Sequence, residues 1–187
     1  MSALLQLFEC AGRGIPQALG DWEARVTAWC HEYRIRFRGA LLSEINLEFA
    51  IFLFDHSLER VTLAYALSVE QLMKRDRTRM RGFPNVNISV RRVLGEKAFA
   101  VDRGHFLGHA SGGILDINLF PQRRDLNRGW SREGKQFRRM ERYVTNHHGT
   151  FFYHRPLYDD DTWIPHLLEY GLLIGGANWC IETFQNK

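Results

Sequence analysis

Apolar positions alternate with polar ones along the chain at two different spacings. Over residues 15–33 they recur every three or four residues, which is the spacing of one face of an α-helix. Residues 45–67 carry two nearly continuous apolar runs on either side of the polar turn 55–59, which predicts a β-hairpin whose first strand is buried. Residues 149–158 and 168–174 are further predicted strands. The apolar face of the predicted helix consists of Leu19, Trp22, Val26, Trp29 and Cys30.

The middle of the chain predicts shorter elements. Residues 69–87 form a basic stretch that starts as a short helix and breaks into a loop. A short strand over 97–101 leads into residues 102–105, and 114–119 is another extended segment. Asp125 or Asn127 caps a helix that continues to about Tyr143. Strands in hairpin order with one long helix between them favour an α+β fold.

Length and composition indicate an ordinary globular protein. The chain has 187 residues, of which 45% are apolar and 25% charged, so we predict a single domain over 1–187. Residues 1–40 are predicted to be a helical N-terminal extension of that domain. The three cysteines show no CxxC spacing, which argues against a disulfide framework and against a cysteine-built zinc site.

The sequence shows no feature of a membrane protein or of a secretory signal. No apolar run approaches the length of a transmembrane helix. The apolar run at the N-terminus has no basic residue before it and is interrupted by Glu9, unlike a signal peptide. We therefore expect no membrane association, and either a cytoplasmic protein or one that a dedicated secretion route delivers.

Basic side chains are concentrated in two stretches, although the net charge is only +4 and the pI about 9.1. Such stretches are usually solvated faces, but they also suit contacts to a phosphate backbone. Among them we predict Arg123, Arg124, Arg128 and Arg132 as nucleic-acid contacts. The first stretch holds Lys74, Arg75, Arg77, Arg79, Arg81, Arg91 and Arg92, and the second Arg123, Arg124, Arg128, Arg132, Lys135, Arg138, Arg139 and Arg142.

Residues 102–142 contain the side chains that phosphodiester hydrolysis needs. Histidine suits the activation of water because its pKa lies near neutrality, a hard divalent ion with oxygen ligands neutralises the growing charge, and arginines hold phosphate. The sequence DRGH (102–105) follows a predicted strand, and amide side chains and a helix rich in arginine follow it.

The combined pattern resembles the DNA/RNA non-specific endonuclease family, the endonuclease-G-like nucleases of the ββα-metal or His-metal finger class. The resemblance rests on DRGH, on N-x-x-P-Q at 118–122, on DLN-x-G at 125–129 and on Trp130 before a charged helix. It extends over roughly 48–175, with matches to the opening hairpin, to the basic stretch and to the later strand pair. It implies a central, mostly antiparallel sheet flanked by helices, with an inserted ββα-metal finger that carries the site.

The resemblance also implies the role of each site residue. His105 is the general base that activates water, and Asn127 is the one direct protein ligand of Mg²⁺ or Mn²⁺. Arg103 and Arg138 bind phosphate or the charge of the transition state. Asp102, Asn118 and Gln122 support these groups. The implied activity is that of a phosphodiesterase that cuts both DNA and RNA.

The chain departs from the family pattern at three points. The acidic residue expected near position 134 is replaced by Gly134, so we predict that Glu133 takes its place, with Glu141 as the alternative. The segment from His105 to Asn127 is short for the family. Phe-Leu-Gly-His follows DRGH where an Ala-Pro-like pair is expected, which adds the imidazole of His109.

Two alternatives stay open. The missing acid at 134 is compatible with a nucleic-acid-binding module that has lost catalysis. The second alternative is a nuclease toxin that an inhibitor or immunity protein controls. Nucleases of the family that this chain resembles are often homodimers, so a homodimer is a further possible state. Elsewhere, we expect Trp130 to pack its helix onto the sheet, and His147, His148 and His154 to lie in a solvated loop rather than in a zinc site.

Overall fold

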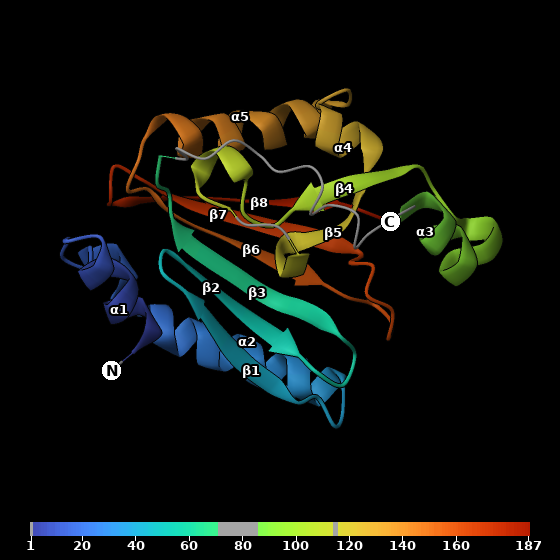
Figure 1. Ribbon diagram of the computed structural model, residues 1–187, viewed down its shortest axis with the longest axis horizontal. Coiled ribbons are helices and arrows are strands. Elements are labelled where there is room, and N and C mark those ends of the chain that lie inside the picture. Colours follow the sequence, from blue (N-terminus) through green and yellow to red (C-terminus); the bar gives the residue numbers. More distant parts are fainter. Residues whose placement is uncertain (1, 71–85, 114–115) are drawn as a thin grey trace.

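The strands form one large and one small antiparallel sheet. The computed structural model describes residues 2–70, 86–113 and 116–187 (Figure 1). The large sheet has six strands in the order β1-β2-β3-β6-β7-β8, and the small one pairs β4 with β5. The predicted α+β class with a mostly antiparallel sheet is therefore confirmed. The strands are β1 (Leu42–Leu47), β2 (Ala50–Asp55), β3 (Arg60–Leu67), β4 (Val101–His105), β5 (Leu119–Arg123), β6 (Phe151–Leu157), β7 (Leu167–Ile174) and β8 (Asn178–Gln185).

Long apolar runs located the central strands correctly. The predicted hairpin is β2–β3, and the two later predicted strands are β6 and β7. The predicted first strand is wrong in one respect, because the chain reverses at Glu48 (φ 34°) and residues 42–47 form the separate strand β1. Strand β8 was not predicted, since it is an edge strand with mostly exposed side chains and no continuous apolar run.

Helices cover both faces of the large sheet. On one face lie α1 (Ala3–Cys10) and α2 (Trp22–Arg36), and on the other lies α5 (Arg132–Asn146) (Figure 1). Side chains of a strand point alternately to the two faces. In β3, Leu63 and Tyr65 pack with α1 and α2, whereas Ala64 packs in the core of the α5 side.

The N-terminal region is helical, and its main helix uses the predicted apolar face. A short 3-10 turn at 17–19 precedes α2, which begins only at Trp22 and continues to Arg36. Trp22 is completely buried, and its ring centroid lies 4.8 Å from that of Phe151 and 5.3 Å from that of Tyr65. Trp29 packs at the edge of the same cluster, so α2 is joined to the sheet mainly by aromatic side chains.

The middle of the chain forms a compact unit beside α5. Helix α3 (Val86–Leu94) and a 3-10 turn at 95–97 precede β4, so the predicted strand at 97–101 begins only at Val101. Residues 116–118 form another 3-10 turn, and the predicted segment 114–119 is extended only from Leu119. Residues 114–115, and Lys74 to Arg81 of the first basic stretch, lie outside the described residues.

The long helix predicted to continue to Tyr143 is in fact two helices. Helix α4 (Arg124–Arg128) ends at Gly129 in the left-handed conformation (φ 72°), and α5 starts after Ser131, whose hydroxyl accepts a hydrogen bond from Gly134 N. Asn127 therefore lies within α4 and not at the start of the long helix. The break turns α5 onto the large sheet while α4 stays against β4 and β5.

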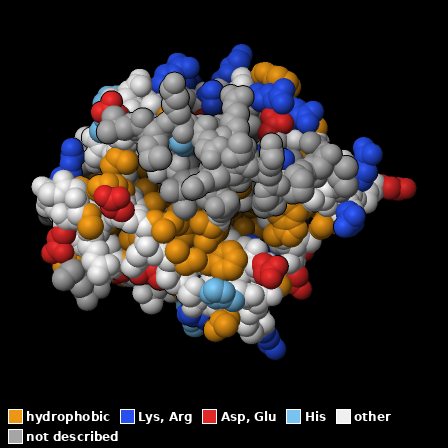
Figure 2. All heavy atoms as spheres, in the orientation of Figure 1, with side chains coloured by type: hydrophobic (Ala, Val, Ile, Leu, Met, Phe, Trp, Pro, Cys, Tyr) orange, Lys and Arg blue, Asp and Glu red, His pale blue; other side chains and the backbone are white. Residues whose placement is uncertain are grey.

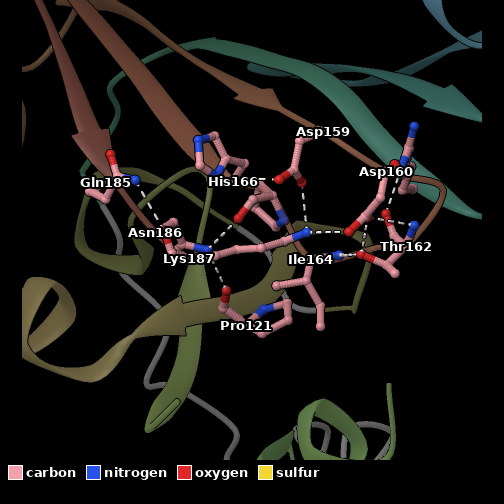
Figure 3. Close-up of polar contacts among 11 residues, drawn as sticks. Pro121, Asp159, Asp160, Thr162, Ile164, His166, Gln185, Asn186 and Lys187 are labelled. Atoms are coloured by element: carbon pink, nitrogen blue, oxygen red, sulfur yellow. Dashed lines mark hydrogen bonds and ion pairs between the residues drawn. The ribbon is translucent and has the colours of Figure 1, made fainter. Parts of the chain in front are cut away.

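One buried amide ties the small sheet to the large one. Asn186 lies just beyond β8 and is completely buried. Its Nδ2 donates to Pro121 O at 3.0 Å and to Pro165 O at 2.9 Å (Figure 3), and its Oδ1 accepts from Arg123 N at 2.8 Å. Because all three partners are backbone atoms, this side chain substitutes for a missing strand pairing and fixes β5 in place.

Candidate active site

A cavity of about 760 Å³ lies beside β4, α4 and α5. The structure brings together along it five of the predicted site residues, namely Arg103, His105, Asn127, Arg128 and Arg138. Glu141, the alternative acid, also lines this cavity. A smaller cavity of about 340 Å³ lies on the α2 face and contains none of the predicted site residues.

His105 is the last residue of β4, and the chain beyond it is held by Asn118. Asn118 Oδ1 accepts from Leu107 N at 2.8 Å, and its Nδ2 donates to Leu107 O at 2.7 Å. Phe106 N also donates to Asn118 O at 3.0 Å. Asn118 is completely buried, so these bonds are shielded from water. This side chain therefore fixes the direction in which the chain leaves His105.

Asp102 fastens α4 to β4. Its carboxylate accepts hydrogen bonds from Arg128 Nε at 2.6 Å, Arg124 Nε at 3.1 Å and Asn127 Nδ2 at 3.4 Å. Partial burial raises the pKa of Asp102, but these hydrogen bonds outweigh the burial and lower the pKa below its usual value. Asn127 uses its Nδ2 as the donor to Asp102, and the residue lines the cavity.

Gln122 lies on β5 beside β4 and does not line the cavity. It is 1% exposed and pairs with Asp102 across the two strands. Its side chain crosses Gly104, where a Cβ would lie only 2.5 Å from Gln122 Cβ. The glycine of DRGH is thus required by its close packing against Gln122.

The acid expected near position 134 cannot be accommodated there. Helices α4 and α5 approach so closely that a Cβ on Gly134 would lie 2.4 Å from Asp125 O. Glu133, our predicted replacement, does not line the cavity, and its carboxylate accepts from Arg123 Nη2 at 2.5 Å. Glu141 follows Gly134 by seven residues, which is two helical turns, and it therefore lies on the same face of α5.

The carboxylate of Glu141 lies in a sheltered position within the cavity wall. Its side chain is 27% exposed and forms an ion pair with Arg138 at 3.2 Å. Burial raises the pKa of Glu141, and the guanidinium of Arg138 only partly offsets this effect. Glu141 is consequently a stronger candidate than Glu133 for the acidic role.

The predicted nucleic-acid-binding arginines fall into two groups. Arg123 is paired with Asp125 at 2.6 Å and with Glu133, and Arg124 is paired with Asp102, so these two hold the fold together. Arg128 lines the cavity, and Arg132 is exposed. Figure 2 shows Lys and Arg side chains gathered along the edge of the molecule where α5 lies in Figure 1.

His154 also lines the cavity, although the sequence did not predict it as a site residue. The expectation that it lies in a solvated loop is wrong: it is in β6, 2% exposed, and lines the cavity. It stacks on Tyr170 with ring centroids 3.9 Å apart, and within the described residues neither of its ring nitrogens makes a hydrogen bond of normal geometry, although the backbone of Phe106 lies close enough to influence it. The strand alternation that puts Phe152 into the core of the α5 side puts His154 on the same face, and this was the signal available in the sequence.

Trp130 and His109 are two further side chains with aromatic rings at the cavity. Trp130 does not pack α5 onto the sheet, because it is 63% exposed and lines the cavity. His109 lines the cavity as well, and its Nδ1 lies 3.3 Å from Gly113 O. Among the described residues, no group of three or more His, Cys, Asp or Glu side chains is arranged to hold a metal ion.

Comparison with known proteins adds no family assignment. No protein-family model matches the chain, and no characterised protein matches it in sequence. In the part of the chain that the structure describes, no helix is long and apolar enough to cross a membrane.

The burial of His154 predicts an acid-sensitive fold. Burial lowers the pKa of His154 to about 3, and the nearby Phe106 backbone offsets this only slightly. An unfolded histidine has a pKa of about 6.5, so the unfolded state takes up the proton first and stability falls as the pH drops from about 6.5 towards 3. Because the unfolded state takes up this proton, we expect the free energy of unfolding to fall by about 2 kcal/mol between pH 7 and pH 5.

Denaturant unfolding of the wild type and of His154→Phe at the two pH values measures this contribution. Phe cannot take up a proton, and it leaves no buried nitrogen without a partner. The variant should therefore lose about 2 kcal/mol less than the wild type between pH 7 and pH 5. Glu141 and Tyr170 face His154 in both proteins, so their titration cancels in the comparison. Equal losses in the two proteins would show that His154 is solvated in solution.

Proposed function

We propose that this protein is a metal-dependent endonuclease that hydrolyses phosphodiester bonds of DNA and RNA with little sequence preference. In this proposal β4, β5 and α4 are the ββα-metal unit of a DNA/RNA non-specific endonuclease. The observation that carries the proposal is the convergence of His105, Asn127, Arg138 and Glu141 on one cavity. These residues are an imidazole, an amide, a cation and a carboxylate, as hydrolysis of a phosphodiester requires.

The residues of the cavity suit a magnesium-like ion. Mg²⁺ prefers oxygen ligands and usually keeps several waters, so one or two protein oxygens are enough to hold it. Asn127 offers its carbonyl oxygen, because Asp102 occupies its Nδ2, and Glu141 offers a carboxylate in the same cavity. When bound, the ion supplies positive charge that neutralises the phosphate and the leaving oxygen.

The protein's own groups perform the remaining tasks. His105 accepts the proton of the attacking water, and the guanidinium groups of Arg103 and Arg138 bind the phosphate oxygens. Asp102 orients Asn127 and holds Arg128 at the cavity, while Asn118 and Gln122 fix β4 and the segment after it. An imidazole that is held by a rigid strand end can approach the water in one orientation, which lowers the entropic cost of the reaction.

The decisive experiment is cleavage by the purified chain. Plasmid DNA and total RNA are incubated with the protein in the presence of Mg²⁺ or Mn²⁺ and, separately, with a chelator. We expect both substrates to be cut with the metal and neither to be cut with the chelator. If the wild type cuts neither substrate with either ion but still binds them, the chain is the degenerate binding module instead.

Control of the protein by an inhibitor protein and its assembly into a homodimer stay predictions.

The two glutamates offer a matched pair of variants. Glu141→Gln is expected to lower kcat/KM for cleavage about 10- to 100-fold, because it removes the carboxylate that lines the cavity. Glu133→Gln is expected to change kcat/KM less than about threefold, because its carboxylate is paired with Arg123 away from the cavity. Initial rates over a range of Mg²⁺ concentrations measure both. The reverse order of effects would assign the acidic role to Glu133.

A further inference from the structure

Trp130 is a large aromatic side chain exposed at the cavity of the candidate site. It is 63% exposed, whereas Trp22 in the core is completely buried. It lines the same cavity as His105 and Asn127, three residues after Asn127 in the chain. A tryptophan that is mostly exposed gains little packing energy in the folded protein, and side chains of this kind concentrate where a ligand or partner covers them.

The position of this ring is fixed by its neighbours. Gly129 ends α4 in the left-handed conformation, and Trp130 N donates to Asp125 O at 2.9 Å. The guanidinium of Arg128 lies over the ring, 4.8 Å from its centroid, and Asp102 holds this guanidinium at 2.6 Å. Arg128 lies over one face of the ring, and 63% of the residue remains exposed. The protein thus presents a preorganised aromatic surface.

We propose that Trp130 stacks on an unpaired nucleobase, and that the site therefore prefers single-stranded nucleic acid to duplex. The proposal rests on the proposed endonuclease function and specifies its substrate. A tryptophan can stack on a base only where a face of that base is open, and in a duplex both faces are covered by neighbouring bases. Stacking also tolerates any sequence, because every base has an aromatic face.

The size and the polar wall of the cavity agree with a nucleotide as occupant. Sites that enclose small organic ligands measure roughly 300–1,000 Å³, and this cavity measures about 760 Å³. Its wall includes His154, which is 2% exposed and whose ring nitrogens have no hydrogen-bond partner in the described residues. A neutral imidazole provides one donor and one acceptor, which a base edge or a sugar hydroxyl can use. A phosphodiester group could accept from the donor nitrogen but would leave the acceptor nitrogen without a partner, because it has no hydrogen to donate.

Binding and cleavage by Trp130 variants test the proposal. Fluorescence anisotropy in a chelator measures the affinity of the full chain for one labelled 20-nucleotide strand and for its duplex, without cleavage. The same two substrates are then cut in Mg²⁺. We expect the wild type to bind and cut the single strand at least tenfold better. Trp130→Ala should lose about tenfold on the single strand and less than twofold on the duplex, and Trp130→Phe should keep most of the preference.

The other possible results of this experiment separate base stacking, strand preference and endonuclease function from one another. Equal losses on both substrates would overturn base stacking and would assign Trp130 to the support of α4. No loss on either substrate would also overturn base stacking. Cleavage of single strand and duplex at equal rates would overturn the strand preference and leave the endonuclease function intact. No cleavage with Mg²⁺, together with single-strand binding that depends on Trp130, would sustain the stacking and refute the endonuclease.

Discussion

Replacing His105 by alanine is expected to abolish most phosphodiester cleavage while the affinity for nucleic acid stays within about twofold. A general base contributes about 10²- to 10⁴-fold to a rate, so kcat should fall by a factor in this range. Affinity should persist because the arginines along the cavity, among them Arg138 and Arg142, are unchanged. Single-turnover cleavage of a labelled oligonucleotide in Mg²⁺ measures the rate, and binding in a chelator measures the affinity.

His109 provides the matched control for this experiment. It is a second imidazole on the same cavity, so His109→Ala removes a ring of the same size. We expect it to lower kcat less than about tenfold, because no part of the proposed chemistry needs it. Added imidazole should restore part of the activity of His105→Ala by supplying the missing base. If His109→Ala has the larger effect, the base has been assigned to the wrong histidine.

The sequence predicted the elements that long apolar runs mark, and it failed where a contact between elements decides. Strands β2, β3, β6 and β7 are central in the sheet, and their runs of buried side chains are evident in the sequence. The break between α4 and α5 was missed because it depends on the left-handed Gly129 and on the close approach at Gly134, which no periodicity reveals.

The same distinction applies to the site. Residues that follow one another on β4 and α4, such as His105 and Asn127, could be proposed from the DRGH and DLN motifs. His154 comes from β6 and Glu141 from the far part of α5, and only the packing of α5 on the sheet brings them to the cavity. Glu133 was preferred for its position beside Gly134, but its carboxylate is held by Arg123 instead.

The proposed site is assembled from two parts of the molecule. The small sheet carries the proposed base, α4 carries the proposed metal ligand, and the large sheet and α5 supply His154, Glu141 and Arg138. Asn186 and the core between α5 and the large sheet keep the two halves in register. We therefore expect mutations at the contact between the two sheets to slow cleavage although the mutated residues do not contact the substrate. A shift of about 1 Å in a reacting group lowers the rate on the order of 10²-fold.

Removal of the Asn127 side chain is the second variant with a large expected effect. Asn127→Ala should lower kcat/KM by on the order of 10²- to 10³-fold at a fixed Mg²⁺ concentration, because it deletes the carbonyl oxygen that we propose as the metal ligand. It should also raise the Mg²⁺ concentration needed for half-maximal rate. The fold should survive, because Arg124 and Arg128 still bind Asp102 across β4 and α4.

A conservative variant separates loss of the ligand from loss of the hydrogen bond to Asp102. Asn127→Asp keeps an oxygen for the ion but removes the Nδ2 donor, so it should retain more activity than Asn127→Ala if metal binding is what counts. If the two variants are equally impaired and neither changes the Mg²⁺ requirement, Asn127 acts by positioning α4 and is not the ligand. Cleavage titrated with Mg²⁺ and with Mn²⁺ distinguishes these cases, because a missing ligand shifts the metal dependence whereas a displaced helix lowers the rate at every metal concentration.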